Sequence, residues 1–151
     1  YIFVFFHHPL YSIGASRVED AKELRARFGT VFQAHKVNAV FTGHDHHYHR
    51  EIAGGVQFVD GGVAGGKARP IDAPIPPETV KYASVESFTR VDVGADEARV
   101  RVTDVAGNTV DEFVLTPRPQ PAPSGSGARS RSLPGHDLPF FPRWTLRRRK
   151  G

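Results

Sequence analysis

The feature that most limits the fold is an alternation of apolar and amphipathic segments over residues 2–42. Residues 2–6 (Ile-Phe-Val-Phe-Phe) are continuously apolar, which is typical of a strand buried on both faces. Residues 37–42 form a second apolar run, and we expect a second buried strand there. Between the runs, apolar side chains recur at helical spacing at Val18, Ala21, Leu24, Phe28, Val31 and Phe32. A strand, a helix and a strand within about forty residues predict a βαβ unit with parallel strands.

Two positions in the predicted helix have specific conformational preferences. Ser16-Arg17-Val18-Glu19 has the form of a capping box, in which the Ser16 hydroxyl and the Glu19 carboxylate bond free backbone N–H groups. Gly29 lies inside the helical pattern and costs about 1 kcal/mol relative to alanine. We therefore expect a side-chain cap at the start of the helix and a bend or break at Gly29.

Six of the eight histidines fall in two short segments, each directly after an apolar run. His7 and His8 follow the first run, and residues 43–50 (Gly-His-Asp-His-His-Tyr-His-Arg) follow the second. In open α/β sheets, ligands bind outside the carboxyl ends of the strands. We therefore expect the two histidine segments to lie close together at one edge of a sheet.

Imidazole is the commonest metal ligand among side chains, and it suits zinc, iron, copper and nickel. On extended backbone, His44 and His46 would lie on the same face, about 6–7 Å apart at Cα. Such a pair could bind one ion, or one ion each of a pair about 3.5–4 Å apart. A solvated histidine-rich loop is the alternative, but two such segments at strand ends favour a metal site.

The rest of the chain up to residue 116 is predicted to be mostly β-strand. Strand-like runs occupy residues 56–59, 87–93, 97–105 and 109–115, with a hairpin turn at residues 106–108. Residues 61–67 come close to a phosphate-binding loop, but Ala68 stands where a Ser or Thr would contact magnesium, and Pro70 would obstruct the following helix. A tight turn near the metal site, where glycine lets the backbone approach closely, is the better interpretation.

The net charge of +4 comes from the last part of the chain. Residues 117–151 contain eight Lys and Arg against one Asp, whereas residues 1–116 contain twelve basic and fifteen acidic residues. The folded part is therefore mildly acidic, and we predict no specific nucleic-acid partner. The sequence has no cysteine and no apolar run of about 18–20 residues, so we expect neither thiolate ligands nor a transmembrane segment.

The composition also suggests where the folded part ends. Proline, glycine and serine dominate residues 117–127, which predicts a basic, disordered tail over residues 117–151. Residues 1–116 would form the folded domain part. The chain begins inside an apolar run and without methionine, so we expect it to be a fragment of a longer protein.

The two histidine segments, in this order and at this separation, resemble a known family. Phe-Phe-His-His-Pro-Leu-Tyr-Ser at residues 5–12 is followed, after the predicted helix, by Val-Phe-Thr-Gly-His-Asp-His-His-Tyr-His-Arg at residues 40–50. The pattern resembles the C-terminal half of calcineurin-like metallophosphoesterases, and especially the purple acid phosphatase-like branch, whose last motif is similar to Gly-His-x-His-x-Tyr-Glu-Arg. The resemblance is firm over residues 1–66, loose over residues 87–115, and does not extend to the tail.

The resemblance implies an α/β (α+β) fold, in which the chain is a fragment of a four-layered αββα sandwich followed by a β-rich segment. It also implies a dinuclear centre of two divalent or mixed-valence metal ions, either iron, zinc or manganese. By resemblance, His7 and His44 bind one ion and His46 binds the other. His8 matches no family ligand and would lie behind the ligands or face the substrate phosphate. Asp45 falls between two ligands and is expected to point away from the ions.

Other residues of the last motif are interpreted by their place in it. His49 stands where the family branch often has Glu, and we expect it to change hydrogen bonding around the ligands rather than ligation. Tyr48 and Arg50 are expected to pack and to orient the segment. The carboxylate ligands and the proton-donating histidine of the family belong to motifs that precede this part. We therefore expect the fragment alone to be inactive.

The sequence thus predicts metal-dependent hydrolysis of a phosphoester substrate by the parent protein. A non-catalytic metal-binding or scaffold module derived from the same fold is one alternative. An unrelated protein whose histidine-rich loop sequesters ions is another. A purple acid phosphatase-like chain without cysteine and with a proline-rich tail is compatible with an exported or envelope enzyme of a bacterium.

Overall fold

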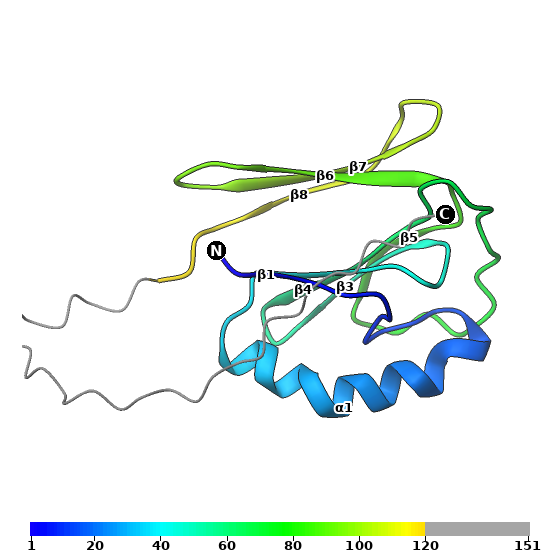
Figure 1. Ribbon diagram of the computed structural model, residues 1–151, viewed down its shortest axis with the longest axis horizontal. Coiled ribbons are helices and arrows are strands. Elements are labelled where there is room, and N and C mark those ends of the chain that lie inside the picture. The colour runs from blue at the N-terminus through cyan, green and yellow to red at the C-terminus, as the bar shows by residue number, and fades with distance from the viewer. Residues whose placement is uncertain (120–151) are drawn as a thin grey trace, which may run out of the picture. The chain divides into compact units, whose positions relative to one another are not determined.

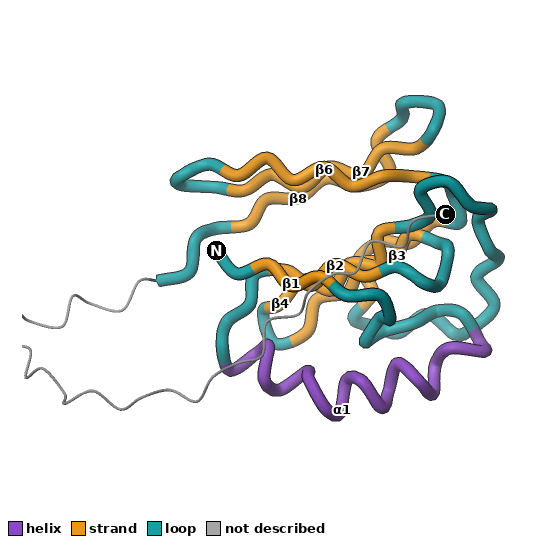
Figure 2. The backbone as a smooth tube through the Cα atoms, in the orientation of Figure 1, coloured by secondary structure: helices purple, strands orange, loops and turns teal. Residues whose placement is uncertain are grey.

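The computed structural model describes residues 1–119, and it consists of two sheets and a helix (Figures 1 and 2). The five-stranded sheet has the order β1-β2-β4-β3-β5, and the three-stranded sheet has the order β6-β7-β8. The elements are β1 Phe3–Phe5, η1 Ala15–Arg17, α1 Val18–Ala34, β2 Ala39–Thr42, β3 Tyr48–Ala53, β4 Val56–Gly61, β5 Thr79–Ala83, β6 Ser87–Val93, β7 Ala98–Asp104 and β8 Thr109–Leu115. The predicted tail lies outside the described residues from residue 120 onward.

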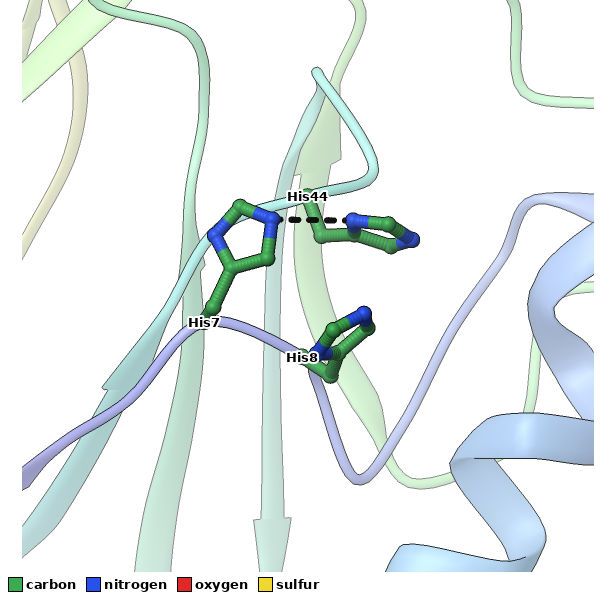
Figure 3. Close-up of side chains that lie close together, drawn as sticks. All are labelled: His7, His8 and His44. Atoms are coloured by element: carbon green, nitrogen blue, oxygen red, sulfur yellow. Dashed lines mark hydrogen bonds between the residues drawn. The ribbon is translucent and has the colours of Figure 1, made fainter.

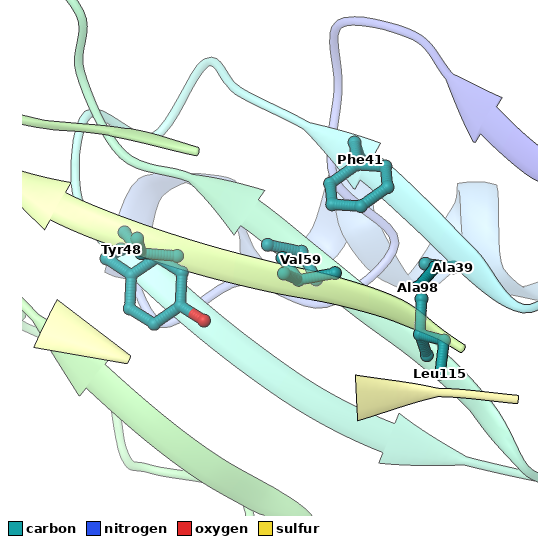
Figure 4. Packing of buried hydrophobic residues seen from close by; sticks show 8 residues of the cluster. Ala39, Phe41, Tyr48, Val59, Ala98 and Leu115 are labelled. Atoms are coloured by element: carbon teal, nitrogen blue, oxygen red, sulfur yellow. The ribbon is translucent and has the colours of Figure 1, made fainter. Parts of the chain in front are cut away.

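The helix and the two sheets form three layers, with the five-stranded sheet in the middle (Figure 1). Side chains from both sheets fill the space between them and are shown in Figure 4. The buried members of this cluster are Ala39, Phe41, Tyr48, Val59, Ala98, Val100, Val102 and Leu115. A second buried cluster lies on the helix side and contains Leu10, Val37, Val40, Val56 and Phe58, with Leu24 and Phe32 of α1 packed against it. These two apolar cores hold the three layers together.

Strand β2 contributes to both cores because successive side chains of a strand point to opposite faces. Ala39 and Phe41 lie in the cluster between the sheets, whereas Val40 lies in the cluster beneath α1. The prediction of a buried strand over residues 37–42 is therefore confirmed. Strand β1 differs, because it forms the edge of the sheet and Phe5 at its end is 69% exposed. The expectation that residues 2–6 are buried on both faces is wrong at Phe5.

The strand–helix–strand prediction is confirmed. β1 pairs with β2 in parallel, with Val4 opposite Val40, and β2 pairs in parallel with β4. α1 connects β1 to β2 and covers one face of the sheet (Figures 1 and 2). This topology places the carboxyl ends of β1 and β2 side by side, and both histidine segments begin there.

The predicted capping box is wrong. Residues 15–17 form a 3-10 turn instead, and the Arg17 N–H donates to the Gly14 carbonyl at 2.9 Å. The N-cap of α1 is Arg17, with no side-chain cap bond. The Glu19 carboxylate accepts a hydrogen bond from Lys22 Nζ at 2.6 Å, so it does not turn back to cap the helix.

The helix does not break at Gly29, since α1 continues to Ala34. Gly29 is buried, and a Cβ added there would meet only Arg25 Cγ of the same helix, at 3.4 Å. The helix is neither long enough nor apolar enough to cross a membrane, and the same holds for any other helix in residues 1–119.

The strand predictions for the second half are confirmed for β4, β6, β7 and β8, including the turn between β7 and β8. Two strands were not predicted, β3 and β5. β3 begins inside the histidine-rich segment and has the sequence Tyr-His-Arg-Glu-Ile-Ala, in which four residues are ionisable. β5 is mostly exposed and lies at the sheet edge next to β3.

Candidate metal centre

The two histidine segments lie against each other, as the sequence predicted. The loop after β1 and the loop after β2 are joined by a backbone hydrogen bond from the Gly43 N–H to the His7 carbonyl at 3.0 Å. Phe5 and Phe41 are register partners at the ends of the paired strands, and their rings stack with centroids 5.2 Å apart. The parallel pairing therefore fixes the separation of the two loops.

Three imidazoles converge at this edge of the sheet, those of His7, His8 and His44 (Figure 3). Nδ1 of His44 and Nε2 of His7 are 3.0 Å apart. The ring centroids are 4.9 Å apart for His7 and His8 and 4.2 Å apart for His8 and His44. One nitrogen from each ring lies within 4.8 Å of the others, so the three side chains form a group that could hold a metal ion.

The separation of His7 Nε2 and His44 Nδ1 fits two ligands of one ion. Two nitrogens bound at about 2.0–2.1 Å are about 2.9 Å apart at a right angle and about 3.3 Å apart at a tetrahedral angle. The observed 3.0 Å lies between these values. His7 is exposed and His44 half-buried, so the group is open to solvent on one side. The residue geometry therefore fits an accessible metal site.

Arg17 also contacts this group, although the sequence analysis assigned it no role at the site. Its guanidinium donates a hydrogen bond to His44 Nε2, so in the metal-free ring Nδ1 carries the proton and donates to His7 Nε2. A metal ion bound at Nδ1 would take the place of this proton and of the Arg17 bond. The pKa of His44 is lowered, first by burial and then by the positive charges of Arg17, His8 and His7. A lowered pKa keeps the ring neutral near pH 7, which is the form that binds metal ions. Arg17 thus adds a fixed positive charge beside the three imidazoles.

His46 lies outside the group of three, and its ring is held by the backbone of the glycine-rich turn. The Lys67 carbonyl only accepts hydrogen bonds, so His46 Nδ1 donates to it at 3.2 Å and Nε2 keeps a free lone pair. A hydrogen bond of this kind orients metal-binding histidines. A Cβ added to Gly66 would lie 3.4 Å from His46 Cε1 and 2.8 Å from Val63 Cγ2. The predicted close approach of the glycine-rich turn is therefore confirmed.

The local backbone of the second histidine segment differs from the prediction. His44 and His46 have φ values of 75° and 62°, which are left-handed rather than extended. The two side chains are therefore not presented as alternate residues of a strand, and His46 does not join His44. β2 ends at Thr42, and β3 begins at Tyr48. The intervening residues turn sharply, because the chain passes from a parallel to an antiparallel strand of one sheet.

Asp45 and His47 point into the protein, and with Asp60 they form a second candidate group, all three buried. Asp45 lies outside the exposed histidine group, as expected. The sequence analysis did not single out His47 or Asp60. A usable signal was that Asp60 follows the apolar run of β4, which is another parallel strand neighbouring β2.

Tyr48 and Arg50 have packing and orienting roles, as predicted. The Tyr48 hydroxyl donates to Asp111 Oδ2 at 2.7 Å, and Arg50 Nε donates to the same oxygen at 2.6 Å. This network connects β3 in the large sheet to β8 in the small one. His49 bonds Thr79 Oγ1 at 3.0 Å rather than one of the three converging histidines. Burial lowers the pKa of His49 to about 4.

No protein-family model matches the chain, and no curated protein matches it. Among solved structures, the chain is similar to GAP50, the anchor in the inner membrane complex of Plasmodium, at 15% identity and a TM-score of 0.69. The match covers 78% of this chain and 38% of GAP50. Vps29 from Entamoeba histolytica complexed with Zn²⁺ is similar at 22% identity and a TM-score of 0.39, over 61% of this chain and 46% of Vps29.

The chain therefore spans less than half the length of the structures that it matches. Likeness at these identities shows the fold alone, and GAP50 is the structure whose fold agrees well with that of this chain, at a TM-score of 0.69. The helix and the two sheets of the described residues form a mixed α/β fold, which is in line with the predicted fragment of a metallophosphoesterase-like α+β fold.

Proposed function

We propose that the chain is part of a metal-dependent phosphoester hydrolase, in which His7 and His44 bind one metal ion and His46 binds a second. The observation that carries the proposal is the convergence of His7 Nε2 and His44 Nδ1, 3.0 Å apart. The hydrogen bond from His46 Nδ1 to the Lys67 carbonyl supports it, because this bond leaves Nε2 free for an ion.

When two ions are bound, they lower the pKa of a water molecule and hold the phosphoryl oxygens for in-line attack. The side chains of this chain would keep the site in position and attract the substrate. His7 and His44 are fixed by the parallel pairing of β1 and β2. Arg17 lies beside His44 and offers the planar, charged donor group that suits a phosphate. His8 packs against the same ring, where it can donate to a phosphate oxygen.

Part of the ligand set would come from outside this chain. The exposed group contains three imidazoles and no carboxylate, whereas ions held close together need anionic ligands to balance their charge. The family resemblance implies that carboxylates from preceding motifs complete the centre, and the chain covers only 38% of GAP50. We therefore propose that the 151-residue chain binds metal but does not turn over substrate.

The test is hydrolysis of bis(4-nitrophenyl) phosphate and 4-nitrophenyl phosphate by the complete protein loaded with zinc, manganese or iron. His44→Ala is expected to lower kcat/KM by at least about 100-fold, because it removes a group that fixes an ion in the transition state. His35→Ala is the matched control, because His35 is exposed at the end of α1. Equal activity in both variants would contradict the proposal.

A non-catalytic scaffold is the second candidate. It is favoured by the likeness to GAP50, which is described as an anchor, because the same fold serves a structural role there. A metal-loaded complete protein that hydrolyses neither substrate, while His44→Ala still loses an ion, would favour this candidate. It would also separate metal binding from catalysis.

A further inference from the structure

A second polar group lies beneath the loop that carries His44 and His46. It consists of Asp45 and His47 from that loop and Asp60 near the end of β4. The exposed fractions of the three residues are 2%, 1% and 3%. One ligand atom from each residue lies within 4.8 Å of the others. This arrangement is separate from the exposed group described above, because it faces the interior.

The polar atoms of this buried group lack partners among residues 1–119. They are Asp45 Oδ1, His47 Nδ1 and Nε2, and both carboxylate oxygens of Asp60. Ser12 Oγ donates to Asp45 Oδ2, and this is the one side-chain hydrogen bond that the three residues make within the described part of the chain. His47 Nε2 lies 3.8 Å from Asp45 Oδ2, which is too far for a hydrogen bond. Buried polar side chains are normally satisfied, so five unpaired atoms in one place indicate a missing occupant.

The chemistry of the group identifies the class of that occupant. The imidazole offers a lone pair, and each carboxylate offers oxygen ligands. Burial and the neighbouring Asp45 raise the pKa of Asp60 well above its usual range, so two charges at this place are costly without a cation. A divalent cation would displace the Asp60 proton, neutralise both carboxylates and accept one lone pair from each side chain. Mixed nitrogen and oxygen ligands are typical of zinc and related transition-metal ions rather than of calcium or magnesium.

We propose that Asp45, His47 and Asp60 bind a divalent transition-metal ion of the zinc type in the interior of the domain. This ion connects the loop after β2 to the end of β4. The left-handed conformation of His44 and His46 lets the residues between and after them point inward. The buried ion would therefore fix the loop from below while the neighbouring histidines face solvent.

The proposal is tested with the metal-free 151-residue chain by zinc titration calorimetry, zinc content after desalting, and thermal unfolding. One variant, His7→Ala/His44→Ala/His46→Ala, removes the exposed ligands. A second, Asp60→Asn, removes a buried ligand with little change in shape. Asp92→Asn is the matched control for the second variant, because the Asp92 side chain is 55% exposed.

The exposed-ligand variant is expected to keep one zinc per chain after desalting, and zinc is expected to raise its Tm by at least about 5 °C. Asp60→Asn is expected to lose this ion and to bind zinc at least tenfold more weakly at the buried site than Asp92→Asn does. Retention of the same ion by Asp60→Asn, or no tightly bound zinc in the exposed-ligand variant, would overturn the proposal.

Two further measurements keep the test decisive if Asp60→Asn does not fold. His47→Gln replaces the imidazole and is expected to lose the same ion. X-ray absorption spectra of zinc in the exposed-ligand variant should show a single imidazole among oxygen ligands, since Asp45 and Asp60 supply oxygens. Spectra with two or more imidazoles would refute the assignment. The exposed site is judged separately, by the zinc that the unmodified chain binds beyond this ion.

Discussion

Asp111 joins the two sheets, and its removal provides a quantitative test of the fold. It accepts hydrogen bonds from the Tyr48 hydroxyl at 2.7 Å and from Arg50 Nε and Nη2 at 2.6 and 3.3 Å. The Arg50 and Asp111 side chains are 8% and 10% exposed. Replacing Asp111 by alanine would leave a buried guanidinium and a buried hydroxyl without this acceptor. Removing one partner of a buried ion pair costs about 3–5 kcal/mol.

The expected cost is near the lower end of that range. Arg50 keeps a hydrogen bond to Gln57 Oε1 at 3.1 Å, and its guanidinium stacks on the Phe113 ring at 4.3 Å. We therefore expect Asp111→Ala to lower the free energy of unfolding by about 3 kcal/mol. Tyr48→Phe leaves the ion pair intact and removes one hydrogen bond, so about 1 kcal/mol is expected.

The assay is urea denaturation followed by far-ultraviolet circular dichroism at pH 7. The matched control is Asp92→Ala, which removes an exposed Arg–Asp pair with a 2.9 Å contact to Arg90 and should cost at most about 1 kcal/mol. A loss for Asp111→Ala no larger than that for Asp92→Ala would refute the argument. It would mean that the network does not hold the sheets together.

Further predictions concern the pH dependence of stability and the turn beside His46. Burial raises the pKa of Glu51 to about 7 from 4.5, so the folded state binds this proton more tightly than the unfolded state does. The free energy of unfolding should therefore fall as the pH rises from 4.5 to 7. In urea titrations, Glu51→Gln should be more stable than the unmodified chain by about 1–3 kcal/mol at pH 8, with no gain at pH 4. Glu19→Gln, at an exposed site, is the control and should show no such difference. Gly66→Ala should lower zinc affinity by about tenfold in calorimetry, because the new Cβ would press on Val63 and the His46 ring; unchanged affinity would show that this turn does not position His46.

The sequence predicted the parts of the fold in which local pattern and packing agree. The apolar run at residues 37–42 became β2, buried on both faces, and α1 follows the helical spacing of its apolar side chains. The proximity of His7 and His44 followed from a topological rule, since both residues come after parallel strands. No side-chain information was needed for this prediction.

The strand β3 could not be predicted from its pattern, because its buried positions are polar. His49, Arg50 and Glu51 are each at most 7% exposed. Their burial depends on partners far along the chain, such as Asp111 for Arg50. A prediction from hydropathy alone assigns such residues to the protein surface. The strand is recognisable only once its partners are placed.

The backbone conformation of residues 43–47 could not be predicted from local sequence preferences either. Side chains other than glycine rarely have positive φ, so extended backbone was the reasonable expectation for His44 and His46. The loop instead adopts left-handed values at both residues. This conformation separates outward histidines from the inward Asp45 and His47, and it produces two groups of candidate ligands where the sequence predicted one.

The most direct test of the central claim is a crystal structure of the chain grown with zinc, with anomalous diffraction data collected on both sides of the zinc edge. We predict an anomalous peak about 2.0–2.1 Å from His7 Nε2 and His44 Nδ1. A second peak is expected among Asp45, His47 and Asp60. Absence of a peak between His7 and His44, with zinc bound elsewhere, would contradict the proposal that these histidines form a metal centre.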